Sequence, residues 1–338
     1  MDAVMEDYME KALGWGILAT GWIAELFTQD LIDAGLTVAA VGSRSPEKAA
    51  AFAQRFGISN AHGSYEDLVA DPDVDIIYVA TPHPQHVAAA LLALDAGKHI
   101  LIEKPFTLNA PEARQIVERA ASKSLVVLEA MWTRFLPHMQ RIHEVIDAGT
   151  LGTLRSLTAE HKQSLPTDPH HRLNALELGG GALLDLGIYP ISFAFDILGL
   201  PTEVKATARF KDTGVDAEVA TVMQHADAAI SVTTSALDCA GPNTAVIYGS
   251  KARIEIASVW YSPTSFRVID HEGAILEEFT ETVTGRGMQF QAFEMERLVR
   301  SGSASKVMKP EETIAVMETL DEVRRQIVLV YPSEQGMS

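Results

Sequence analysis

Lys104, Asp185 and Tyr189 are the residues whose types and spacing best suit acid-base chemistry. A tyrosine hydroxyl can take up or return a proton if a nearby cation lowers its pKa from about 10 toward neutrality. Lys104 ends an apolar, strand-like run, where an ammonium is costly to bury without a partner, so it is placed to be that cation. Asp185 precedes Tyr189 by four residues and would share its face on a helix, where it could orient the lysine or a substrate hydroxyl.

Each of the three residues also has a purely structural interpretation. Lys104 could simply end a strand, and Tyr189 could pack beside a helix kink at Pro190. Asp185 could cap a helix that begins after the glycine run of residues 179–181. We favour the chemical role in each case.

A turn of small residues joins the first apolar run to the first amphipathic stretch. It reads Ala19-x-Gly21-x-x-Ala24, a dinucleotide-binding fingerprint that lacks its first glycine. Gly21 permits close backbone approach and Ala24 permits tight helix packing, so a pyrophosphate could rest on the helix N-terminus. An ordinary strand-to-helix turn is the alternative. The residues expected to contact a cofactor here are Ala19, Thr20, Gly21, Trp22 and Ile23.

The end of the second apolar run indicates which dinucleotide binds. An enzyme that uses NAD normally places an acidic residue there to bind the ribose diol, but this sequence has Ser43, Arg44 and Ser45. A guanidinium with neighbouring hydroxyls suits a 2′-phosphate, so we expect NADP, with NAD as the second choice. Lys48, one helical turn further on, adds a positive charge or is a surface residue, and Arg44 as a solvated loop residue is the alternative.

The elements that would position these residues fall into two groups. From Gly16 to about Leu128 the chain alternates short apolar runs with amphipathic stretches, which predicts a doubly wound parallel sheet of the Rossmann type. A helix is expected near residues 137–148. Residues 152–270 then show period-two alternation without intervening helices, which predicts an open, mostly antiparallel sheet. Amphipathic segments near residues 288–300 and 310–330 predict two closing helices.

These patterns predict an α/β protein of two domains, as the length of 338 residues also favours. We expect a dinucleotide-binding domain over residues 1–129. The α+β domain over residues 130–338 would bind substrate and form oligomers, and its C-terminal helix could pack back on the first domain. Aliphatic residues that point outward from the second sheet predict a homodimer or a homotetramer.

The chain resembles the Gfo/Idh/MocA oxidoreductase family, named after glucose-fructose oxidoreductase and inositol dehydrogenase. The resemblance covers nearly the whole chain and depends on blocks in a fixed order: the turn near Gly21, VATPHPQHVAAALLALDAGKHILIEKP at residues 79–105, GGGALLDLGIYP at 179–190 and LDEVRRQI at 320–327. Residues 131–135, MWTRF, and Tyr189, where inositol-dehydrogenase-like members often have histidine, resemble a narrower branch. That branch holds dimeric dihydrodiol dehydrogenase, NADP-dependent D-xylose dehydrogenase and the glucose-fructose enzyme.

The resemblance implies further site residues. Cofactor contacts are expected from residues that follow the fourth and fifth strands and from the wall of the nicotinamide site: Thr81, Pro82, His83, His86, Glu103, Lys104 and Trp132. For His86 core packing is the alternative, as it is for Trp132. Substrate contacts are expected from Lys104, Trp132, Arg172, Asp185 and Tyr189. Arg172 follows His170 and His171 in a loop that could equally be solvated, and no metal is implied.

The composition excludes several classes of partner and location. A net charge of −18 disfavours nucleic acid and anionic membranes. We find no apolar run near the roughly 18 residues that a membrane-spanning helix needs, and the first ten residues are acidic rather than basic as in a signal peptide. The single cysteine, Cys239, suits a reducing compartment, so a cytoplasmic location is expected.

The sequence therefore predicts an NADP-dependent oxidoreductase that transfers hydride between nicotinamide and a hydroxyl of a sugar or vicinal diol. Two alternatives stay open. One is an oxidoreductase whose tightly held NADP does not exchange, although the long N-terminal arm of the glucose-fructose enzyme is absent. The other is a non-catalytic nucleotide-sensing regulator, against which the joint presence of Lys104, Asp185 and Tyr189 argues.

Overall fold

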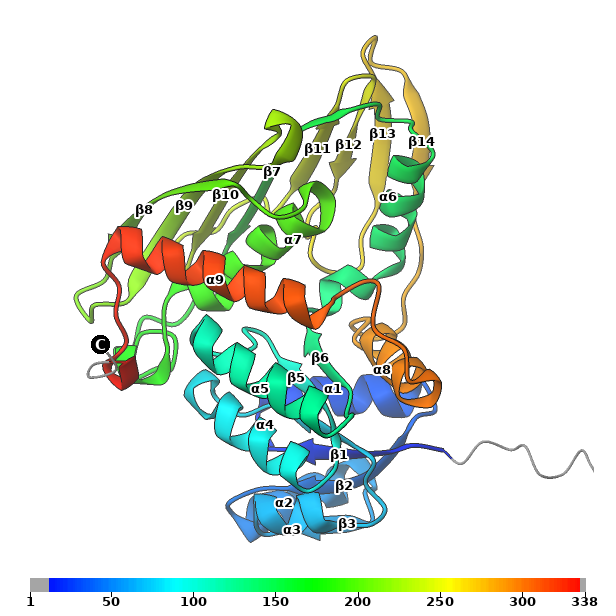
Figure 1. The fold of residues 1–338 in the computed structure, drawn as a ribbon, viewed down its shortest axis with the longest axis vertical. Helices are drawn as coiled ribbons and strands as arrows, with labels where there is room; N and C mark the ends of the chain where they lie inside the picture. Colours follow the sequence, from blue (N-terminus) through cyan, green and yellow to red (C-terminus); the bar gives the residue numbers. More distant parts are fainter. Residues whose placement is uncertain (1–11, 335–338) are drawn as a thin grey trace, which may run out of the picture.

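The computed structural model describes residues 12–334, which form two domains stacked one above the other (Figure 1). The acidic segment that bears on the signal-peptide prediction lies outside the described residues, as do the outer ends of both expected domains. The lower part in Figure 1 is built on a parallel sheet and the upper part on a long, open sheet. The expected α/β fold class is confirmed.

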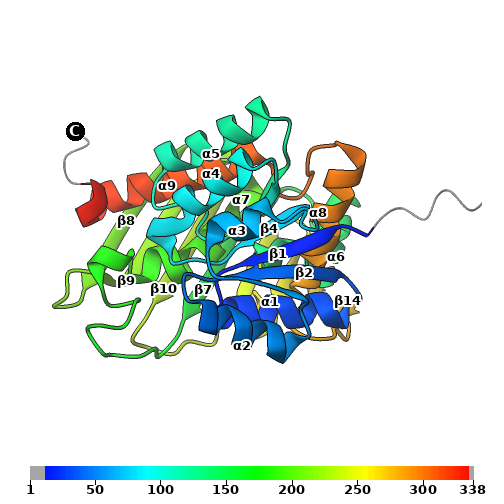
Figure 2. The same ribbon diagram turned by 90° about the horizontal axis from the view of Figure 1, so that it is seen from below.

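The first domain is a doubly wound parallel sheet in the strand order β3-β2-β1-β4-β5-β6. Figure 2 shows helices on both faces of this sheet, with α1 and α2 on one side and α3, α4 and α5 on the other. The strands are β1 (Gly14–Leu18), β2 (Thr37–Gly42), β3 (Asn60–His62), β4 (Ile76–Val79), β5 (His99–Glu103) and β6 (Val127–Ala130). The helices are α1 (Trp22–Asp33), α2 (Pro46–Phe56), α3 (Tyr65–Ala70), α4 (His86–Asp95) and α5 (Ala110–Ser122).

Local signals explain why these segments begin and end where they do. Ser45 caps α2 by accepting a hydrogen bond from the Lys48 amide at 3.3 Å, and Pro46 provides the fixed φ that suits a first helical turn. Gly57 ends the helix with φ of 69°, in the left-handed region where glycine pays no steric penalty. An N-cap such as Ser45 typically contributes about 1 kcal/mol to stability. The turns that lead into the site are therefore fixed locally.

The second domain is an eight-stranded sheet in the order β14-β13-β12-β11-β7-β10-β9-β8. All neighbouring pairs are antiparallel except β7 and β10, which run parallel. The strands are β7 (Leu154–Lys162), β8 (Glu203–Phe210), β9 (Asp216–Gln224), β10 (Ile230–Ala236), β11 (Ala245–Gly249), β12 (Ala252–Ile256), β13 (Phe266–Asp270) and β14 (Ile275–Phe279). The expected open, mostly antiparallel sheet is confirmed.

Two details of this domain differ from the sequence prediction. Helix α7 (Ile188–Leu198) lies between β7 and β8, so the strands do not follow one another without a helix. Its residues are almost all buried, and a helix that is apolar on every side has no amphipathic period to detect. The edge strand β14 was not predicted because its residues are mostly exposed and show no alternation.

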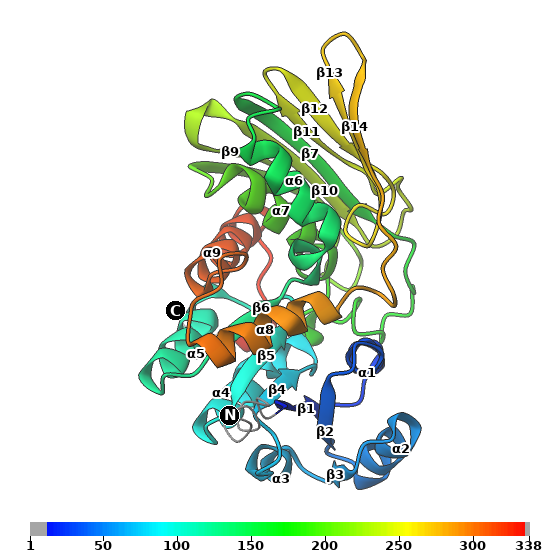
Figure 3. The ribbon, with the colours of Figure 1, turned by 90° about the vertical axis from the view of Figure 1, so that its right-hand side faces the viewer.

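In the described part of the chain, helices cover one face of the second sheet and leave the other open. Figure 3 shows α6 (Pro137–Asp147) and α7 on the same side of the strands, and α9 (Pro310–Ile327) also packs against β8 and α7. The opposite face carries exposed aliphatic and aromatic residues: Val222, Ile230, Val232 and Tyr248. Val222 and Val232 are direct cross-strand partners, so the apolar residues are contiguous there.

The last two helices contact the first domain. Helix α9 lies between β8 of the second domain and α5 of the first (Figure 1), and α8 (Gln289–Ser301) packs against α1. The indole nitrogen of Trp15 on β1 donates a hydrogen bond of 3.0 Å to Glu296 of α8. The two domains are therefore joined by side-chain contacts as well as by the chain crossing after β6.

One expectation about apolar runs is wrong. The helical segment Leu176–Leu198 is long and apolar enough by composition to cross a membrane, with a mean hydropathy of 1.5. However, 83% of its apolar window is buried inside the structure. Its hydropathy is that of a core segment, since it includes α7 and packs beneath the second sheet.

Candidate active site

A cleft of about 850 Å³ lies between the two domains, at the carboxyl ends of the parallel strands. Ligands of doubly wound proteins bind at this edge of the sheet. Every residue predicted from the sequence as a site residue lines this one cleft: Ala19, Thr20, Gly21, Trp22, Ile23, Ser43, Arg44, Lys48, Thr81, Pro82, His83, His86, Glu103, Lys104, Trp132, Arg172, Asp185 and Tyr189. Their individual roles remain predictions.

The turn between β1 and α1 leaves space for an anionic group. Gly21 is the N-cap of α1 and provides no side-chain cap, and a Cβ atom at this position would meet nothing within 4 Å. The first intrahelical bond runs from the Glu25 amide to the Gly21 carbonyl at 3.1 Å, so the earlier amides have no acceptor within the helix. Ala24 is fully buried against the strand. These amides and the helix dipole suit a pyrophosphate.

The far end of the cleft is positively charged. Arg44 and Lys48 are exposed there, and Ser45 also lines the cleft while its hydroxyl caps α2. Tyr65, which sequence reasoning missed, lines the cleft together with Arg44. Burial raises the pKa of Tyr65, although the neighbouring guanidinium opposes this. Among residues 12–334, the acids that line the cleft are Glu103 on β5 and Asp185 in the second domain, so no described cleft-lining carboxylate adjoins Arg44.

Glu103 is held by its own neighbours. Its carboxylate accepts hydrogen bonds from the hydroxyl of Tyr78 and, at 3.2 Å, from the backbone amide of Lys104. Burial raises the pKa of Glu103, and the hydrogen bond from Tyr78 opposes the shift. Glu103 therefore fixes the strand end that carries Lys104.

Lys104 reaches across the cleft to Asp185. Its ammonium donates to the Asp185 backbone carbonyl at 2.8 Å and lies 3.5 Å from the carboxylate oxygen Oδ1. Arg172 contacts the same oxygen at 3.2 Å. Burial acts most strongly against the charge on Lys104, but Asp185, Tyr189 and Glu103 together outweigh it, and the pKa of the lysine is raised. Burial likewise opposes the charge on Asp185, yet Lys104 and Arg172 hold its pKa well below the ordinary value.

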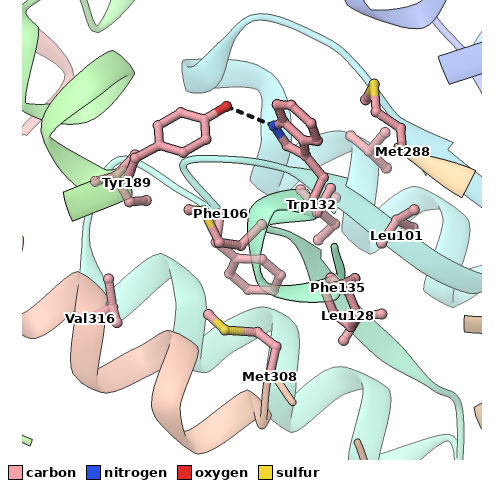
Figure 4. Close-up of a cluster of buried hydrophobic side chains, with 14 of the residues drawn as sticks. Leu101, Phe106, Leu128, Trp132, Phe135, Tyr189, Met288, Met308 and Val316 are labelled. Atoms are coloured by element: carbon pink, nitrogen blue, oxygen red, sulfur yellow. Dashed lines mark hydrogen bonds between the residues drawn. The ribbon is translucent and has the colours of Figure 1, made fainter. Parts of the chain in front are cut away.

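Tyr189 lies beside this ion cluster. The Lys104 ammonium is 4.8 Å from the centre of its ring, and the indole nitrogen of Trp132 donates a 3.0 Å hydrogen bond to its hydroxyl oxygen (Figure 4). The phenol thus accepts one bond, and among residues 12–334 no acceptor takes its proton. The hydroxyl is therefore available to bond a ligand in the cleft.

The expectation of a lowered pKa for Tyr189 is wrong for the protein without ligands. Burial raises the pKa of Tyr189, and the opposing effect of Lys104 is smaller. The physical reason is that the tyrosine is enclosed, while the charge of Lys104 is largely balanced by Asp185 at 3.5 Å.

Asp185 and Tyr189 also sit on a less regular helix than expected. Residues Leu183–Gly187 form a π-helical turn that contains Asp185, and α7 begins at Ile188 with Tyr189 in its first turn. Such turns are often found at functional sites. Asp216 of β9 accepts a hydrogen bond of 2.6 Å from the Leu183 amide and so fixes the start of this turn.

His86 is placed for a structural task. Its Nδ1 is 3.0 Å from the carbonyl of Pro105 and its Nε2 is 2.8 Å from the carbonyl of Thr81, and the side chain is fully buried. It therefore holds two cleft-lining strand ends together. His83 stacks edge-on against His86 at 5.7 Å, and burial lowers its pKa to about 3, so it is neutral.

Sequence reasoning missed several cleft residues of the second domain. His161 stacks on Tyr261 at 3.8 Å and meets the edge of Tyr189 at 5.0 Å, while Gln163 donates to His161 at 2.7 Å. Burial lowers the pKa of His161 to about 3 and raises that of Tyr261 to about 12. His161 could have been found, because it occupies the same buried register of its strand as the apolar residues before it.

Unsatisfied polar atoms point to a ligand in this cleft. Thr81 Oγ1, His83 Nδ1 and His161 Nδ1 are buried and have no hydrogen-bond partner. Buried polar atoms without partners are uncommon, and a bound ligand is one way to satisfy them. Together with the free amides of α1 they fit a polar dinucleotide and its substrate. Within residues 12–334, no group of three or more His, Cys, Asp or Glu side chains could hold a metal ion.

The fold and the cleft together define a two-domain dinucleotide-binding enzyme. Residues 13–131 match the model of the oxidoreductase family with an NAD-binding Rossmann fold, and residues 139–255 match the GFO/IDH/MocA C-terminal domain. The chain belongs to the GFO/IDH/MocA oxidoreductase family.

Individual relatives are similar over nearly their full length. The chain is 37% identical to trans-1,2-dihydrobenzene-1,2-diol dehydrogenase of Mus musculus, over 96% of this chain and 99% of the relative. It is also 37% identical to D-xylose 1-dehydrogenase (NADP(+)) of Hypocrea jecorina, over 95% and 93% of the two chains. Among solved structures, a 3-ketoreductase from Actinomadura kijaniata in complex with NADP and TDP-benzene matches with a TM-score of 0.83 at 27% identity, over 93% and 98% of the two chains.

These comparisons confirm the expected family and branch. They also confirm the expected class of enzyme, an oxidoreductase that uses a nicotinamide dinucleotide.

Proposed function

We propose that this protein catalyses NADP-dependent transfer of hydride to or from a hydroxyl-bearing carbon of a sugar or a vicinal diol. The observation that carries the proposal is the cluster of Lys104, Asp185 and Tyr189 in the cleft, in which the tyrosine hydroxyl has an unused proton. The names of the relatives, a dihydrodiol dehydrogenase and an NADP-dependent xylose dehydrogenase, support the same substrate class.

Each residue of the cluster has a definite task in this proposal. Tyr189 transfers the hydroxyl proton, and the Trp132 bond at 3.0 Å stabilises its deprotonated form. Lys104 bonds the substrate oxygen and offsets negative charge on the tyrosine, while Asp185 holds the lysine in place. Arg172 limits the freedom of Asp185 and lines the substrate end of the cleft. A bound nicotinamide supplies the hydride acceptor or donor.

NADP is the preferred cofactor in this proposal. Arg44 and Lys48 offer two positive charges at the end of β2, and no cleft-lining carboxylate there would repel a 2′-phosphate. NAD lacks that phosphate and would leave both charges without a partner. It remains the second choice.

A substrate screen tests the function. Purified protein is mixed with NADP⁺ and with aldoses, inositols or trans-dihydrodiols, and NADPH formation is followed by absorbance. We expect turnover with at least one sugar or diol, and its loss in Lys104→Met. The absence of turnover in both directions, including reduction of the matching carbonyls with NADPH, would contradict the proposal.

The two alternatives make different predictions in the same preparation. If NADP is held without exchange, the purified protein carries it through gel filtration, and turnover requires an oxidised and a reduced substrate together. If the protein is a regulator, it binds NADP(H) but turns over no substrate. We favour free exchange because the cleft is open to solvent beside an exposed Trp22.

We further propose a homodimer, with a homotetramer as the next possibility, formed through the open face of the second sheet. The exposed residues Val222, Ile230, Val232 and Tyr248 support this, since contiguous apolar residues on a sheet face usually mark an interface. Val232→Lys should shift the mass measured by light scattering toward the monomer. Leu200→Lys, an exposed residue outside this face, is the matched control. A wild-type mass near 36.7 kDa at micromolar concentration would refute the interface.

A cytoplasmic location, without nucleic-acid or membrane partners, completes the proposal. The net charge of −18 and the free thiol of Cys239 support it. Fractionation of producing cells, with the protein recovered in the cytoplasmic fraction, is the expected result.

A further inference from the structure

Arg286 occupies an unusual place at the mouth of the cleft. It belongs to the segment between β14 and α8, yet its guanidinium carbon is 5.6 Å from the centre of the Trp22 ring and 5.5 Å from that of Trp132. Trp22 is the first residue of α1 and is 66% exposed, whereas Trp132 is buried. The arginine therefore lies between an aromatic ring of the pyrophosphate turn and one beside Tyr189.

The backbone of this segment is fixed to the first domain. Asp30 of α1 accepts hydrogen bonds from the amides of Arg286, at 3.1 Å, and Met288, at 2.8 Å. Asp30 is only 4% exposed, so these bonds are shielded from water. Gly285 has φ of 68°, and a Cβ atom there would lie 2.2 Å from Asp30 Oδ1, so the close approach requires glycine. The position of Arg286 is thus built into the fold.

The charge of Arg286 is available for a ligand. The other cleft-lining cations near Tyr189, Lys104 and Arg172, are both paired with Asp185. Within the part of the chain that the structure describes, Arg286 forms no ion pair with a carboxylate. The turn of residues 19–23 has no charged side chain of its own. A pyrophosphate bound at the N-terminus of α1 would carry two negative charges, and the turn itself would offer only backbone amides to stabilise them.

We propose that Arg286 binds the pyrophosphate of the dinucleotide and, together with Trp22, covers it, so that this pair sets how quickly the cofactor leaves. The inference depends on the proposed function, because it requires a dinucleotide in the cleft. The role of Arg286 differs from that of Arg44, which would bind only the 2′-phosphate at the far end of the cleft. Since NADP and NAD share the pyrophosphate, Arg286 acts equally on both.

Direct binding measurements test this proposal. Dissociation constants of NADP⁺, NAD⁺ and adenosine 2′,5′-bisphosphate are measured by calorimetry, and NADPH release by stopped-flow fluorescence. Arg286→Ala should weaken NADP⁺ and NAD⁺ alike, by about tenfold, since it removes a charge-assisted contact. Release of NADPH should accelerate by about the same factor. Adenosine 2′,5′-bisphosphate has no pyrophosphate, so its affinity should stay unchanged.

Two further variants complete the design. Arg286→Lys keeps the charge but loses the planar group that stacks between the rings, so it should fall between wild type and Arg286→Ala. Arg297→Ala removes an exposed arginine of α8 that does not line the cleft, and it should bind like wild type. Circular dichroism at rising temperature checks that each variant is folded.

The outcomes separate this inference from the proposed function. If wild type binds NADP⁺ and Arg286→Ala binds both dinucleotides within twofold of it, the inference is wrong and the proposed function stands. If cofactor affinities are unchanged but the substrate KM rises, Arg286 binds a substrate group instead, which also overturns the inference. If wild type binds neither dinucleotide, both fail.

Discussion

Replacing Tyr189 with phenylalanine isolates the hydroxyl from the rest of the site. The ring would keep its contacts with His161 and Tyr261, which lie 5.0 and 5.4 Å away. The lost bond is the one from Trp132, and an unpaired buried donor costs about 1–3 kcal/mol of folding free energy. Stability is typically about 5–15 kcal/mol, so the variant should remain folded.

The effect on turnover should be much larger than the effect on folding. General acid-base catalysis contributes on the order of 10²- to 10⁴-fold, or about 3–5 kcal/mol of barrier. The loss should fall on kcat, with cofactor affinity little changed, because the hydroxyl acts at the reacting oxygen. Lys104→Met should be at least as damaging. The double variant should be close to the worse single one, because groups that work as a unit are not additive.

The assay is a single-turnover measurement of NADPH formation, made where the chemical step limits the rate. Because burial raises the pKa of Tyr189, its deprotonated form grows only in the alkaline range. Oxidation by the wild type should therefore rise with pH in that range, and Tyr189→Phe should lose this rise. A Tyr189→Phe enzyme that keeps more than about a tenth of native turnover would refute the reasoning and move the proton transfer to another residue.

Three further predictions concern other parts of the molecule. Arg44→Ala should weaken NADP⁺ binding by about tenfold or more and barely change NAD⁺ binding, since a charge-assisted contact with the 2′-phosphate contributes about 1.5–3 kcal/mol. If calorimetry showed that the wild type binds NAD⁺ more tightly than NADP⁺, the cofactor choice would be wrong. Burial raises the pKa of Glu129 from 4.5 to about 7, so its ionisation costs folding free energy as pH rises from 4.5 to about 7. At pH 8, Glu129→Gln should increase the free energy of unfolding by on the order of 3 kcal/mol over wild type, because glutamine has no charge to bury. The urea midpoint should therefore be higher than that of wild type at pH 8 but not at pH 4. An equal difference at both pH values would count against this prediction. Gly181→Ala should destabilise the fold by more than about 2 kcal/mol, because φ is 124° and the new Cβ would lie 2.0 Å from Asp216 Oδ1. The control is Gly302→Ala, where φ is 61° and a Cβ would meet nothing within 4 Å. It should cost only about 1 kcal/mol in the same urea titration.

Much of the first domain could be predicted because its signals are local. Ser45 caps a helix, Gly57 ends it, and apolar runs alternate with amphipathic stretches, so each element can be read within its own residues. The doubly wound order then brings the carboxyl ends of its strands to one edge, which is why the residues expected there line one cleft. Helix α7 was not predicted, because nearly every residue in it is buried and it therefore shows no amphipathic pattern.

The second-domain part of the site could not be predicted in the same way. Tyr261 and Arg286 reach the cleft from loops, and their places depend on long-range contacts such as the hydrogen bond that Asp30 accepts from the Met288 amide. The raised pKa of Tyr189 has the same origin, because enclosure of a hydroxyl depends on packing that one sequence does not reveal. His161 could be predicted in part. The alternation of its strand shows that the side chain is buried, but the sequence does not reveal that it stacks on Tyr261.

The position of α9 has a consequence for the order in which the chain folds during synthesis. Helix α5 and strand β6 are complete by residue 130, but α9, which covers them, begins at Pro310. A ribosome adds about 5–20 residues per second, so this apolar side of the first domain stays uncovered for on the order of ten seconds or more. A nascent chain in that state should bind holdase chaperones, and a version shortened before Pro310 should aggregate even though its parallel sheet is intact.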